Sequence, residues 1–301
     1  MSNSKNFNLF LMDGDVTGRI KCTMANWTGL AFKVPRLYLD KSKDRQDLKQ
    51  SGVYFLFGKN DDDEDQVYIG QAGIRKNGEG ILFRVMEHLK DPDYFNEAVI
   101  LTTQNNSFGP TEISYLENRF TNMASSADRL HVMNSNDPNA GHVTEEKESE
   151  LEDFVEYSKM ALGVLGYKVF VPVVKQNIED NNDKDEDLML HLSVAVEDSG
   201  TSVNYEANCL RTSEGFVVLK GSAIRLSHSV SLPKSLKEIR DKCRANNEIV
   251  DGKLTKNILF NSPSYASSFV LGRSSNGRVT WKTVKDNITL KEFEERQNID
   301  E

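Results

Sequence analysis

The sequence predicts an α+β fold in which a small α/β module precedes a separate α+β domain. Residues 50–125 follow the order strand, strand, helix, strand and helix, judged from β-branched runs and from apolar residues at helical spacing. Residues 176–187 then form a polar stretch rich in Asn and Asp, which is typical of a linker. Strand patterns followed by helical patterns resume beyond it, and they indicate the second domain.

These patterns divide the chain into five expected parts. They are an N-terminal β segment (1–49), the α/β module with a bracing helix (50–170), an acidic linker (171–188), an accessory α+β domain (189–285) and an acidic tail (286–301). The N-terminal segment is expected to hold a strand at 7–11, an irregular β stretch around Trp27 and Pro35, and a polar connector.

Each element of the module has its own signal. Strands are expected at 52–57 and 66–70, joined by an acidic hairpin loop longer than the usual two to five residues. Apolar residues at helical spacing predict a helix at 81–89, and a third strand is expected at 97–103. A helix at 110–124 begins with Pro110, whose missing N–H costs nothing in the first turn.

Helical and strand patterns continue to the end of the chain. The bracing helix is expected from 144 to 165, with one apolar stripe and with Gly166 as its stop. In the accessory domain we expect strands at 189–196, 203–210 and 215–221, helices at 233–246 and 262–272, and a last strand at 279–281 after the turn dipeptide Asn276-Gly277.

The charge is uneven along the chain. The formal net charge of -9 argues against a protein that simply coats nucleic acid. Acidic runs at 61–65, 178–187 and 292–301 are expected to be solvated loops and a frayed end. From 206 to 282 the balance reverses, with 13 Lys or Arg against 6 Asp or Glu. That stretch can present a local basic surface to phosphate groups.

Composition favours a soluble cytoplasmic protein with no membrane partner. Hydrophobic residues make up 38% of the chain and charged residues 28%, as in ordinary globular proteins. No apolar run is long enough to cross a bilayer, and we expect no signal peptide because the first 15 residues lack its basic and apolar regions. Cys22, Cys209 and Cys243 are widely spaced, which fits a reducing compartment and predicts neither disulfides nor a zinc site.

Four polar side chains of the module suggest phosphodiester chemistry. Hydrolysis needs a group that takes a proton from water, a cation that stabilises the developing charge, a metal in most cases, and a proton donor for the leaving oxygen. Tyr54 and Tyr68 stand on neighbouring expected strands and can present their hydroxyls to one side. Arg84 and His88 are four residues apart in a helix, so they share a face beside its apolar stripe.

Glu117 lies at the edge of an apolar stripe in the next helix. It follows Ile113 by four positions and precedes Phe120 by three. A carboxylate at such an edge is partly desolvated and needs a cation or hydrogen-bond donors. A bound Mg²⁺ would serve, since it takes one or two carboxylates and keeps several waters. An arginine (Arg119 or Arg84) or a backbone amide would serve equally.

Four short pieces of the module occur in a characteristic order and spacing: Gly52-Val53-Tyr54, Tyr68-Ile69-Gly70, Arg84-Val85-Met86-Glu87-His88 and Tyr115-Leu116-Glu117-Asn118. With them, residues 50–125 resemble the GIY-YIG endonuclease domain of homing endonucleases, excision-repair incision enzymes and some restriction enzymes. Residues 11–36 resemble the β segment that precedes this domain in a set of bacterial proteins. Residues 215–282 resemble the DUF4357 domain that is often fused to their C-terminus.

The resemblance implies a divalent-metal-dependent endonuclease that hydrolyses DNA. It implies that Tyr54 orients or activates the attacking water and that Tyr68 positions water or phosphate. Arg84 is implied to hold the scissile phosphate and to stabilise its developing charge. His88 matches a histidine or tyrosine that transfers a proton or contacts phosphate.

The same resemblance assigns the metal and two supporting residues. Glu117 is implied to ligate a single Mg²⁺ or Mn²⁺ ion. Gly70 is implied to let the backbone pass closely, and Asn118 to support the site. Many relatives also have a lysine soon after the second tyrosine motif, where this sequence has Gln71, and Arg75 or Lys76 is left to substitute from a loop.

DNA binding is expected to depend on the accessory domain. The module alone is acidic, with 6 Lys or Arg against 12 Asp or Glu in residues 50–125, whereas phosphate neutralisation dominates such binding. Trp281 either stacks on a base or fills the core. The basic side chains form either a DNA-contacting surface or solvated faces, and they are Lys234, Lys237, Arg240, Arg244, Arg273, Arg278 and Lys282.

Two other functions compete with the nuclease. One is a nucleic-acid-binding protein that keeps the fold without the reaction, motivated by the absent lysine and the acidic hairpin loop. The other is an interaction module whose accessory domain binds a protein partner. RNA as substrate stays open beside DNA, and so do mobile-element, repair, restriction and anti-phage settings.

Overall fold

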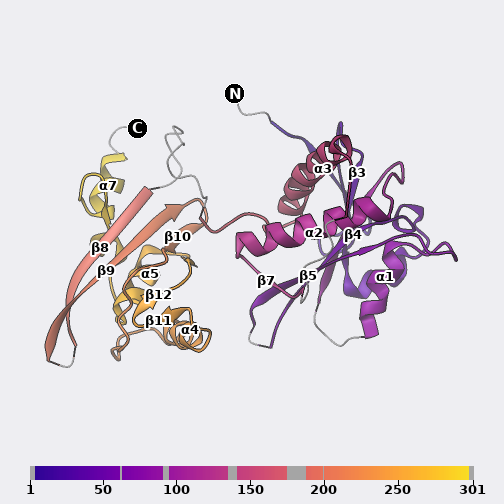
Figure 1. Ribbon diagram of the computed structural model, residues 1–301. Helices are drawn as coiled ribbons and strands as arrows, with labels where there is room; N and C mark the ends of the chain where they lie inside the picture. Colours follow the sequence, from indigo (N-terminus) through magenta and orange to yellow (C-terminus); the bar gives the residue numbers. More distant parts are fainter. Residues whose placement is uncertain are drawn as a thin grey trace. The chain divides into compact units, whose positions relative to one another are not determined.

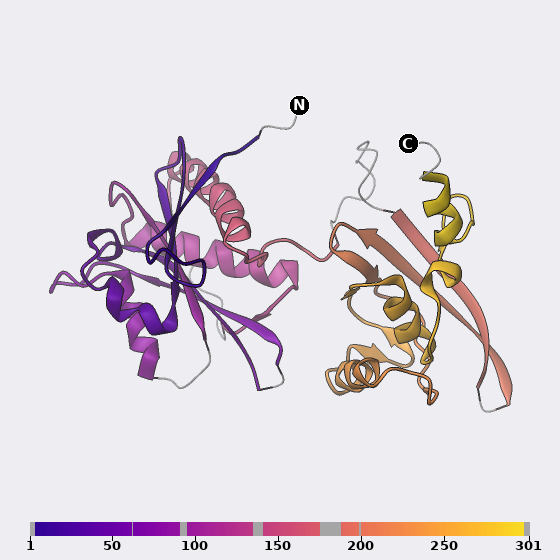
Figure 2. The same ribbon diagram turned by 180° about the vertical axis from the view of Figure 1, so that it is seen from behind.

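A computed structural model of the chain describes residues 4–61, 63–90, 95–134, 141–174, 188–198 and 200–297. The chain divides into two compact units, Met1–Pro172 and Val173–Glu301, which we call the N-terminal and C-terminal units. Figures 1 and 2 show them from opposite sides. Each unit combines helices with a sheet whose strands are mostly antiparallel, so the predicted α+β class is confirmed.

One seven-stranded sheet organises the N-terminal unit, in the order β1-β2-β3-β6-β4-β5-β7. All neighbouring strands are antiparallel except β5 and β7, which are parallel. The strands are β1 (Phe7–Leu11), β2 (Ile20–Met24), β3 (Gly29–Pro35), β4 (Gly52–Lys59), β5 (Asp65–Ala72), β6 (Glu97–Thr103) and β7 (His131–Val132).

The N-terminal β segment is continuous with the sheet of the module. β3 pairs with β6 along its whole length, from Gly29 opposite Thr103 to Pro35 opposite Glu97. β2 was not among the predicted strands, and it joins β1 to β3. Residues 1–49 therefore extend the sheet on which the tyrosine motifs lie.

Helices cover both faces of this sheet. Val53, Phe55 and Phe57 of β4 share one hydrophobic core with α2 and α3, whereas Tyr54 and Leu56 share the other core with α1. Side chains alternate along a strand, so β4 is buried on both faces. The helices are α1 (Ile81–Glu87), α2 (Pro110–Ala127) and α3 (Glu145–Val164), with 3₁₀ turns at Arg36–Tyr38, Asp40–Ser42, Gln46–Leu48 and His88–Lys90.

The hairpin of β4 and β5 is longer than expected and its loop is shorter. The strands pair from Gly52 opposite Ala72 to Lys59 opposite Asp65, which leaves residues 60–64 as the loop. Five residues lie within the usual range, so the expectation of a long loop was wrong. Pairing extends into the acidic run, where Lys59 Nζ lies 2.8 Å from Asp63 Oδ1. Asp62 is outside the described residues.

Tyr54 lies directly opposite Gly70 in this hairpin. A Cβ atom on Gly70 would come within 2.4 Å of the Tyr54 hydroxyl oxygen and 2.5 Å of its Cζ. The Tyr54 ring therefore lies flat over the bare backbone of β5, and its side chain is 1% exposed. The sequence predicted that the backbone passes closely at Gly70. The group that it contacts there is the ring of Tyr54, the tyrosine of the first motif.

The C-terminal unit is built on a five-stranded antiparallel sheet in the order β13-β10-β9-β8-β14. A long hairpin of β8 and β9 forms its centre, and one hydrophobic core lies between the sheet and helices α4 and α5. The elements are β8 (Leu188–Asp198), β9 (Thr201–Thr212), β10 (Gly215–Val218), α4 (Lys234–Ala245), β11 (Ile249–Val250), β12 (Lys253–Leu254), β13 (Ile258–Phe260), α5 (Pro263–Leu271), α6 (Gly277–Thr280), β14 (Lys282–Thr283) and α7 (Leu290–Gln297).

Two sequence predictions fail near the C-terminus. Residues 277–280 form the short helix α6 instead of a strand, because the Asn276 side chain accepts a hydrogen bond from the backbone N–H of Arg278 as an N-cap. The tail is not frayed over 290–297, where α7 forms and Leu290 is fully buried. The acidic linker predicted at 171–188 lies mostly outside the described residues.

Substitution of Gly70 by alanine is expected to destabilise the N-terminal unit by about 1–3 kcal/mol, because the new methyl group must displace the Tyr54 ring. Gly73→Ala is the matched control, since its Cβ would meet nothing closer than Ile113 Cδ1 at 3.8 Å. Urea unfolding of both variants measures the difference. Equal stability of the two variants would contradict the close Tyr54–Gly70 contact.

Candidate active site

Tyr54, Tyr68 and His88 form one aromatic cluster on the α1 face of the sheet. The Tyr54 ring centroid lies 6.2 Å from that of Tyr68 and 5.6 Å from that of His88, and the Tyr68 and His88 centroids are 5.3 Å apart. The Tyr54 hydroxyl oxygen lies 2.9 Å from His88 Nε2, a hydrogen-bond distance. His88 directly follows the last residue of α1, so this helix brings the imidazole to the tyrosines of β4 and β5.

Arg84 joins the same cluster from α1. Its guanidinium forms a hydrogen bond with the Tyr54 hydroxyl, and its Nη1 lies 2.8 Å from Glu87 Oε2. The hydrogen bond to Glu87 is the main cause that raises the pKa of Arg84. The Tyr54 hydroxyl therefore has an imidazole and a guanidinium beside it, both supplied by one helix end.

Glu117 approaches from α2 at the outer edge of β5. β7 pairs with this edge only at Gln66 and Val67, and the Asn134 side chain then bonds the N–H and the carbonyl of Ile69 at 3.1 and 2.7 Å. Farther along the edge, Gln71 donates hydrogen bonds to the Glu117 carboxylate from its backbone N–H and from its side chain. These contacts hold the Glu117 carboxylate against β5, the strand that carries the second tyrosine motif.

Burial raises the pKa of the Glu117 carboxyl group above its ordinary value. The hydrogen bonds from Gln71 and the positive charge of Arg84 act in the opposite direction and are outweighed. The influence of Arg84 is informative because α1 and α2 cover opposite faces of the sheet. The charge of Arg84 nevertheless acts on the Glu117 carboxylate and lowers its pKa.

The chemistry around Glu117 fits a single hard cation. Within the described ranges, no group of three or more His, Cys, Asp or Glu side chains is placed to hold a metal ion. Mg²⁺ needs only one or two carboxylates when waters complete its octahedral shell. A partly buried carboxylate with a raised pKa is destabilised while it is ionised, and a divalent cation would relieve that cost.

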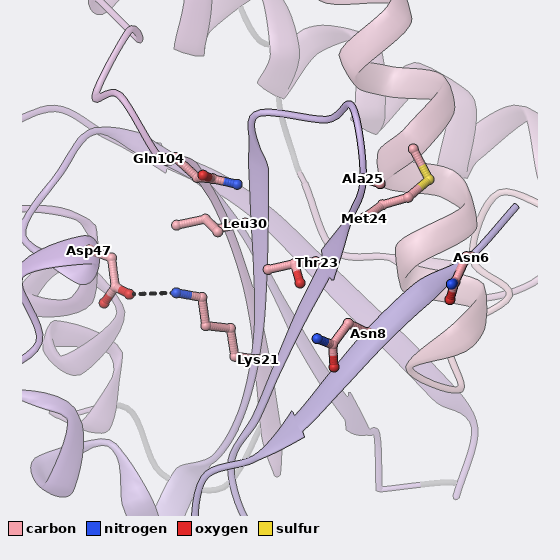
Figure 3. A pocket seen from close by; sticks show the side chains of 9 residues that line it. All are labelled: Asn6, Asn8, Lys21, Thr23, Met24, Ala25, Leu30, Asp47 and Gln104. Atoms are coloured by element: carbon pink, nitrogen blue, oxygen red, sulfur yellow. Dashed lines mark hydrogen bonds and ion pairs between the residues drawn. The ribbon is translucent and has the colours of Figure 1, made fainter.

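A hollow of about 610 Å³ lies on the first three strands, away from this site. Figure 3 shows its nine lining side chains, among them Lys21, whose Nζ lies 3.2 Å from Asp47 Oδ2. None of the lining residues is a candidate catalytic residue, since they are Asn6, Asn8, Lys21, Thr23, Met24, Ala25, Leu30, Asp47 and Gln104. We assign it no role in the reaction.

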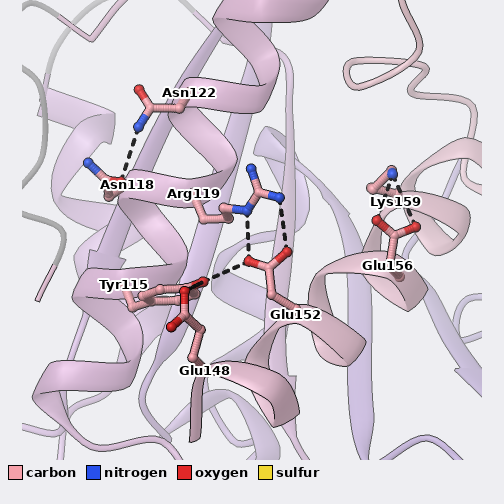
Figure 4. A network of polar contacts seen from close by, with 8 residues as sticks. All are labelled: Tyr115, Asn118, Arg119, Asn122, Glu148, Glu152, Glu156 and Lys159. Carbon is pink, nitrogen blue, oxygen red and sulfur yellow. Dashed lines mark hydrogen bonds and ion pairs between the residues drawn. The ribbon is translucent and has the colours of Figure 1, made fainter. Parts of the chain in front are cut away.

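A polar network fixes α2 against α3 (Figure 4). Arg119 bonds both carboxylate oxygens of Glu152 at 2.7 and 2.9 Å, and the Tyr115 hydroxyl donates to the same carboxylate at 2.7 Å. This network employs the guanidinium of Arg119, so of the two arginines considered for Glu117, Arg84 is the one whose charge acts on it. Asn118 accepts a hydrogen bond from Asn122 at 3.1 Å, a contact along α2 that does not reach Glu117.

Two residues of this site were missed as functional residues. Gln71, noted only as a departure from the family pattern, is the hydrogen-bond donor that fixes Glu117. Glu87 binds both Arg84 and Arg75. Its spacing of three residues from Arg84 in a helix was an available signal, because such residues are neighbours on a helix surface.

Arg240 does not lie on the basic surface predicted for the accessory domain. Its side chain is 1% exposed, and its guanidinium donates to the backbone carbonyls of Phe269, Arg225 and Ser227. Burial lowers its pKa to about 10. Arg240 lies four residues after Leu236 and three before Cys243, both buried, so helical spacing places all three on the inner face of α4.

The other predicted basic residues divide by their partners. Arg244 donates to the carbonyl of Leu226, and Arg278 pairs with Glu294 at 2.8 Å. Trp281 is fully buried and its indole N–H donates to Pro263 O at 3.0 Å, so the packing alternative holds. Five basic residues of the set are exposed, and they are Lys234, Lys237, Arg273, Arg278 and Lys282.

Comparisons with known proteins concern mainly the C-terminal unit. Residues 199–294 match the family model of DUF4357, a domain of unknown function, which confirms that part of the resemblance. The search of curated proteins and the search of solved structures returned no match. Among the described residues, no helix combines the length and the apolar character that a membrane crossing requires.

Substitution of Glu117 by glutamine is expected to raise the melting temperature at neutral pH, on the order of 2 °C. A carboxyl group with a raised folded-state pKa stabilises the fold while it is protonated, and that stability is lost as pH rises through this pKa. The gain should therefore vanish below the pKa of an ordinary glutamate, where both side chains are neutral. Calorimetry from pH 4 to 8 tests this, and a pH-independent difference would contradict it.

Substitution of Arg240 by methionine is expected to destabilise the C-terminal unit by about 2–3 kcal/mol, since backbone carbonyls would lose their donors. Lys237→Met on the exposed face of α4 is the control. The chain has two tryptophans, Trp27 and Trp281. In a Trp27→Phe background, the fluorescence of Trp281 during urea unfolding reports the C-terminal unit alone. Equal midpoints for the two methionine variants would show that the carbonyl contacts contribute nothing.

Proposed function

We propose that this protein is a divalent-metal-dependent endonuclease that hydrolyses phosphodiester bonds of DNA. The observation that supports this most is the juxtaposition of Tyr54, His88 and Arg84 on the α1 side of β5 with Glu117 at the edge of that strand. A proton acceptor, a cation and a metal-binding carboxylate are the groups that phosphodiester hydrolysis requires.

Each side chain has a role that its contacts suggest. The Tyr54 hydroxyl oxygen orients the attacking water and takes its proton, while the proton that this hydroxyl carried passes to neutral His88 Nε2, 2.9 Å away, which becomes an imidazolium and can later return it. The Arg84 guanidinium beside this hydroxyl stabilises the negative charge that develops on the phosphate. Tyr68 packs against both rings and lines the more exposed side of the cluster, where it can position water or phosphate.

Glu117 is the residue that would hold Mg²⁺ or Mn²⁺, with Gln71 fixing the carboxylate in place. When bound, the cation would neutralise charge on the phosphate oxygens and make a coordinated water more acidic. The network of Arg119, Tyr115 and Glu152 supports this role indirectly, because it fixes the helix that presents Glu117.

DNA contacts outside the active site are proposed for the C-terminal unit. Lys234 and Lys237 protrude from α4, and Arg273 and Lys282 are also exposed. These side chains can neutralise phosphates that the acidic module cannot. A protein partner of the same unit is the second candidate.

A nucleic-acid-binding protein without catalytic activity is favoured by one specific observation. Arg84, the proposed phosphate ligand, forms an ion pair with Glu87 at 2.8 Å. A permanent pair would leave the phosphate without its cation. Band shifts without any cleavage product, on single-stranded, duplex and branched DNA with Mg²⁺ or Mn²⁺, would support this alternative.

The decisive variant is Glu117→Gln, which keeps the shape of the side chain and removes its charge. We expect cleavage of DNA to fall by about 10²-fold or more, since one electrostatic group of a catalytic site is typically worth that much, while folding and DNA binding persist. Glu156→Gln is the control, because Glu156 is an exposed carboxylate of α3 paired with Lys159. Full activity of the Glu117 variant in the presence of metal would refute the proposed function.

A further inference from the structure

One carboxylate of the N-terminal unit binds two arginines. Glu87, the last residue of α1, lies with Oε2 2.8 Å from Arg84 Nη1 and with Oε1 2.6 Å from Arg75 Nη2. Each oxygen thus contacts a different guanidinium. Both arginines lower the pKa of the Glu87 carboxyl group, Arg84 the more strongly, so the group stays ionised.

The loop between β5 and α1 holds Arg75 in this position. The backbone N–H of Arg75 donates to Glu79 O at 2.7 Å, and the N–H of Gly78 donates back to Arg75 O at 2.9 Å. Gly78 has a φ of 80°, a conformation that glycine adopts without strain. The backbone of Arg75 is therefore fixed by a closed turn, although its side chain is exposed.

The stability of α1 does not explain why a glutamate occupies position 87. The C-terminal end of a helix carries a partial negative charge, which disfavours a carboxylate in the last turn. Glu87 occupies that turn of α1, and the nearby arginines compensate for it. Its two oxygens each contact a different guanidinium, as the two non-bridging oxygens of a phosphodiester can.

We propose that Arg75 and Arg84 form a two-arginine phosphate site, which Glu87 fills in the unliganded protein and leaves when a DNA phosphate binds. This inference rests on the proposed function, because it adds Arg75 as a second phosphate ligand to the site of Tyr54 and Arg84. The side chains of Arg75, Arg84 and Glu87 are 42%, 41% and 33% exposed. Ion pairs between groups so accessible to water are weak, so a phosphate can replace the carboxylate.

The exchange also reconciles two features of the site. Arg84 can be paired in the unliganded protein and still serve as a phosphate ligand. Arg75 supplies a basic group in a module where acidic residues outnumber basic ones, and it comes from the loop that follows the second tyrosine motif. Glu87 then acts as an internal competitor that sets how tightly the site binds an anion.

The test measures binding of a fluorescein-labelled 20-base-pair DNA duplex to the full chain by anisotropy, in EDTA and at several salt concentrations. Without divalent metal no cleavage is expected, so the result is independent of the Glu117 variants. Arg75→Gln should weaken binding about fivefold or more at 50 mM salt. It should also reduce the slope of log K against log salt by about 0.9, the value for one phosphate contact. Lys159→Gln, which removes a cation of α3 that pairs with Glu156, should change the affinity less than twofold.

Glu87→Gln gives the opposite sign and separates the proposal from a merely structural role. Loss of the competing anion should tighten duplex binding about two- to fivefold, with unchanged circular dichroism. Weaker binding would show that Glu87 only positions the arginines, and it would overturn the proposal. Equal losses in Arg75→Gln and Lys159→Gln, or no duplex binding by the wild-type chain, would overturn it as well. Binding that depends on Arg75 without any cleavage in Mg²⁺ would refute the nuclease and leave the phosphate site standing.

Discussion

The close contact between Tyr54 and the bare backbone at Gly70 is the constraint on which the rest of the site depends. The pairing of β4 with β5 places these residues opposite each other, and only a glycine leaves room for the ring. The ring is thereby buried while its hydroxyl remains within 2.9 Å of His88. A one-residue slip of the register would turn Tyr54 toward the α2 core and dismantle the cluster. Strand pairing therefore decides which side chains meet in this cluster.

The same hairpin connects helices that lie on opposite faces of the sheet. α1 presents Arg84 and His88 over one face, and α2 presents Glu117 from the other. At the outer edge of β5, Gln71 bonds the Glu117 carboxylate, and the charge of Arg84 acts on the same carboxylate. The ion pair of Arg119 with Glu152 fixes α2 to α3 and so helps to keep α2 in place beside β5. An edge that most proteins must protect against aggregation is here used to assemble a site.

The arginine side chains differ in whether they are buried in the protein or exposed to solvent. Arg240 is buried and donates through its terminal guanidinium nitrogens to backbone carbonyls, so it contributes to the packing of the C-terminal unit and not to its surface. Arg75 and Arg84 are exposed, and both bind the carboxylate of Glu87. Because such exposed ion pairs are weak, little free energy is needed to separate them. Counting basic residues along the sequence cannot distinguish these cases, because a guanidinium is equally charged in both and only its surroundings differ.

The sequence by itself determined the α+β class, most strands and helices, and the C-terminal family, because alternation, helical spacing and capping residues are local properties. It also selected Tyr54, Tyr68, Arg84 and His88, whose motifs sit on adjacent elements that fold together. Only the tertiary structure decided that Gly70 accommodates Tyr54, that Gln71 fixes Glu117, and that Glu87 binds two arginines. It likewise buried Arg240, added β2 to the sheet and made residues 277–280 helical. Most of these features arise from contacts between segments distant in sequence, which local periodicity does not encode. The helix at 277–280 instead follows from the Asn276 cap, a local signal that the expected turn at Asn276-Gly277 left out.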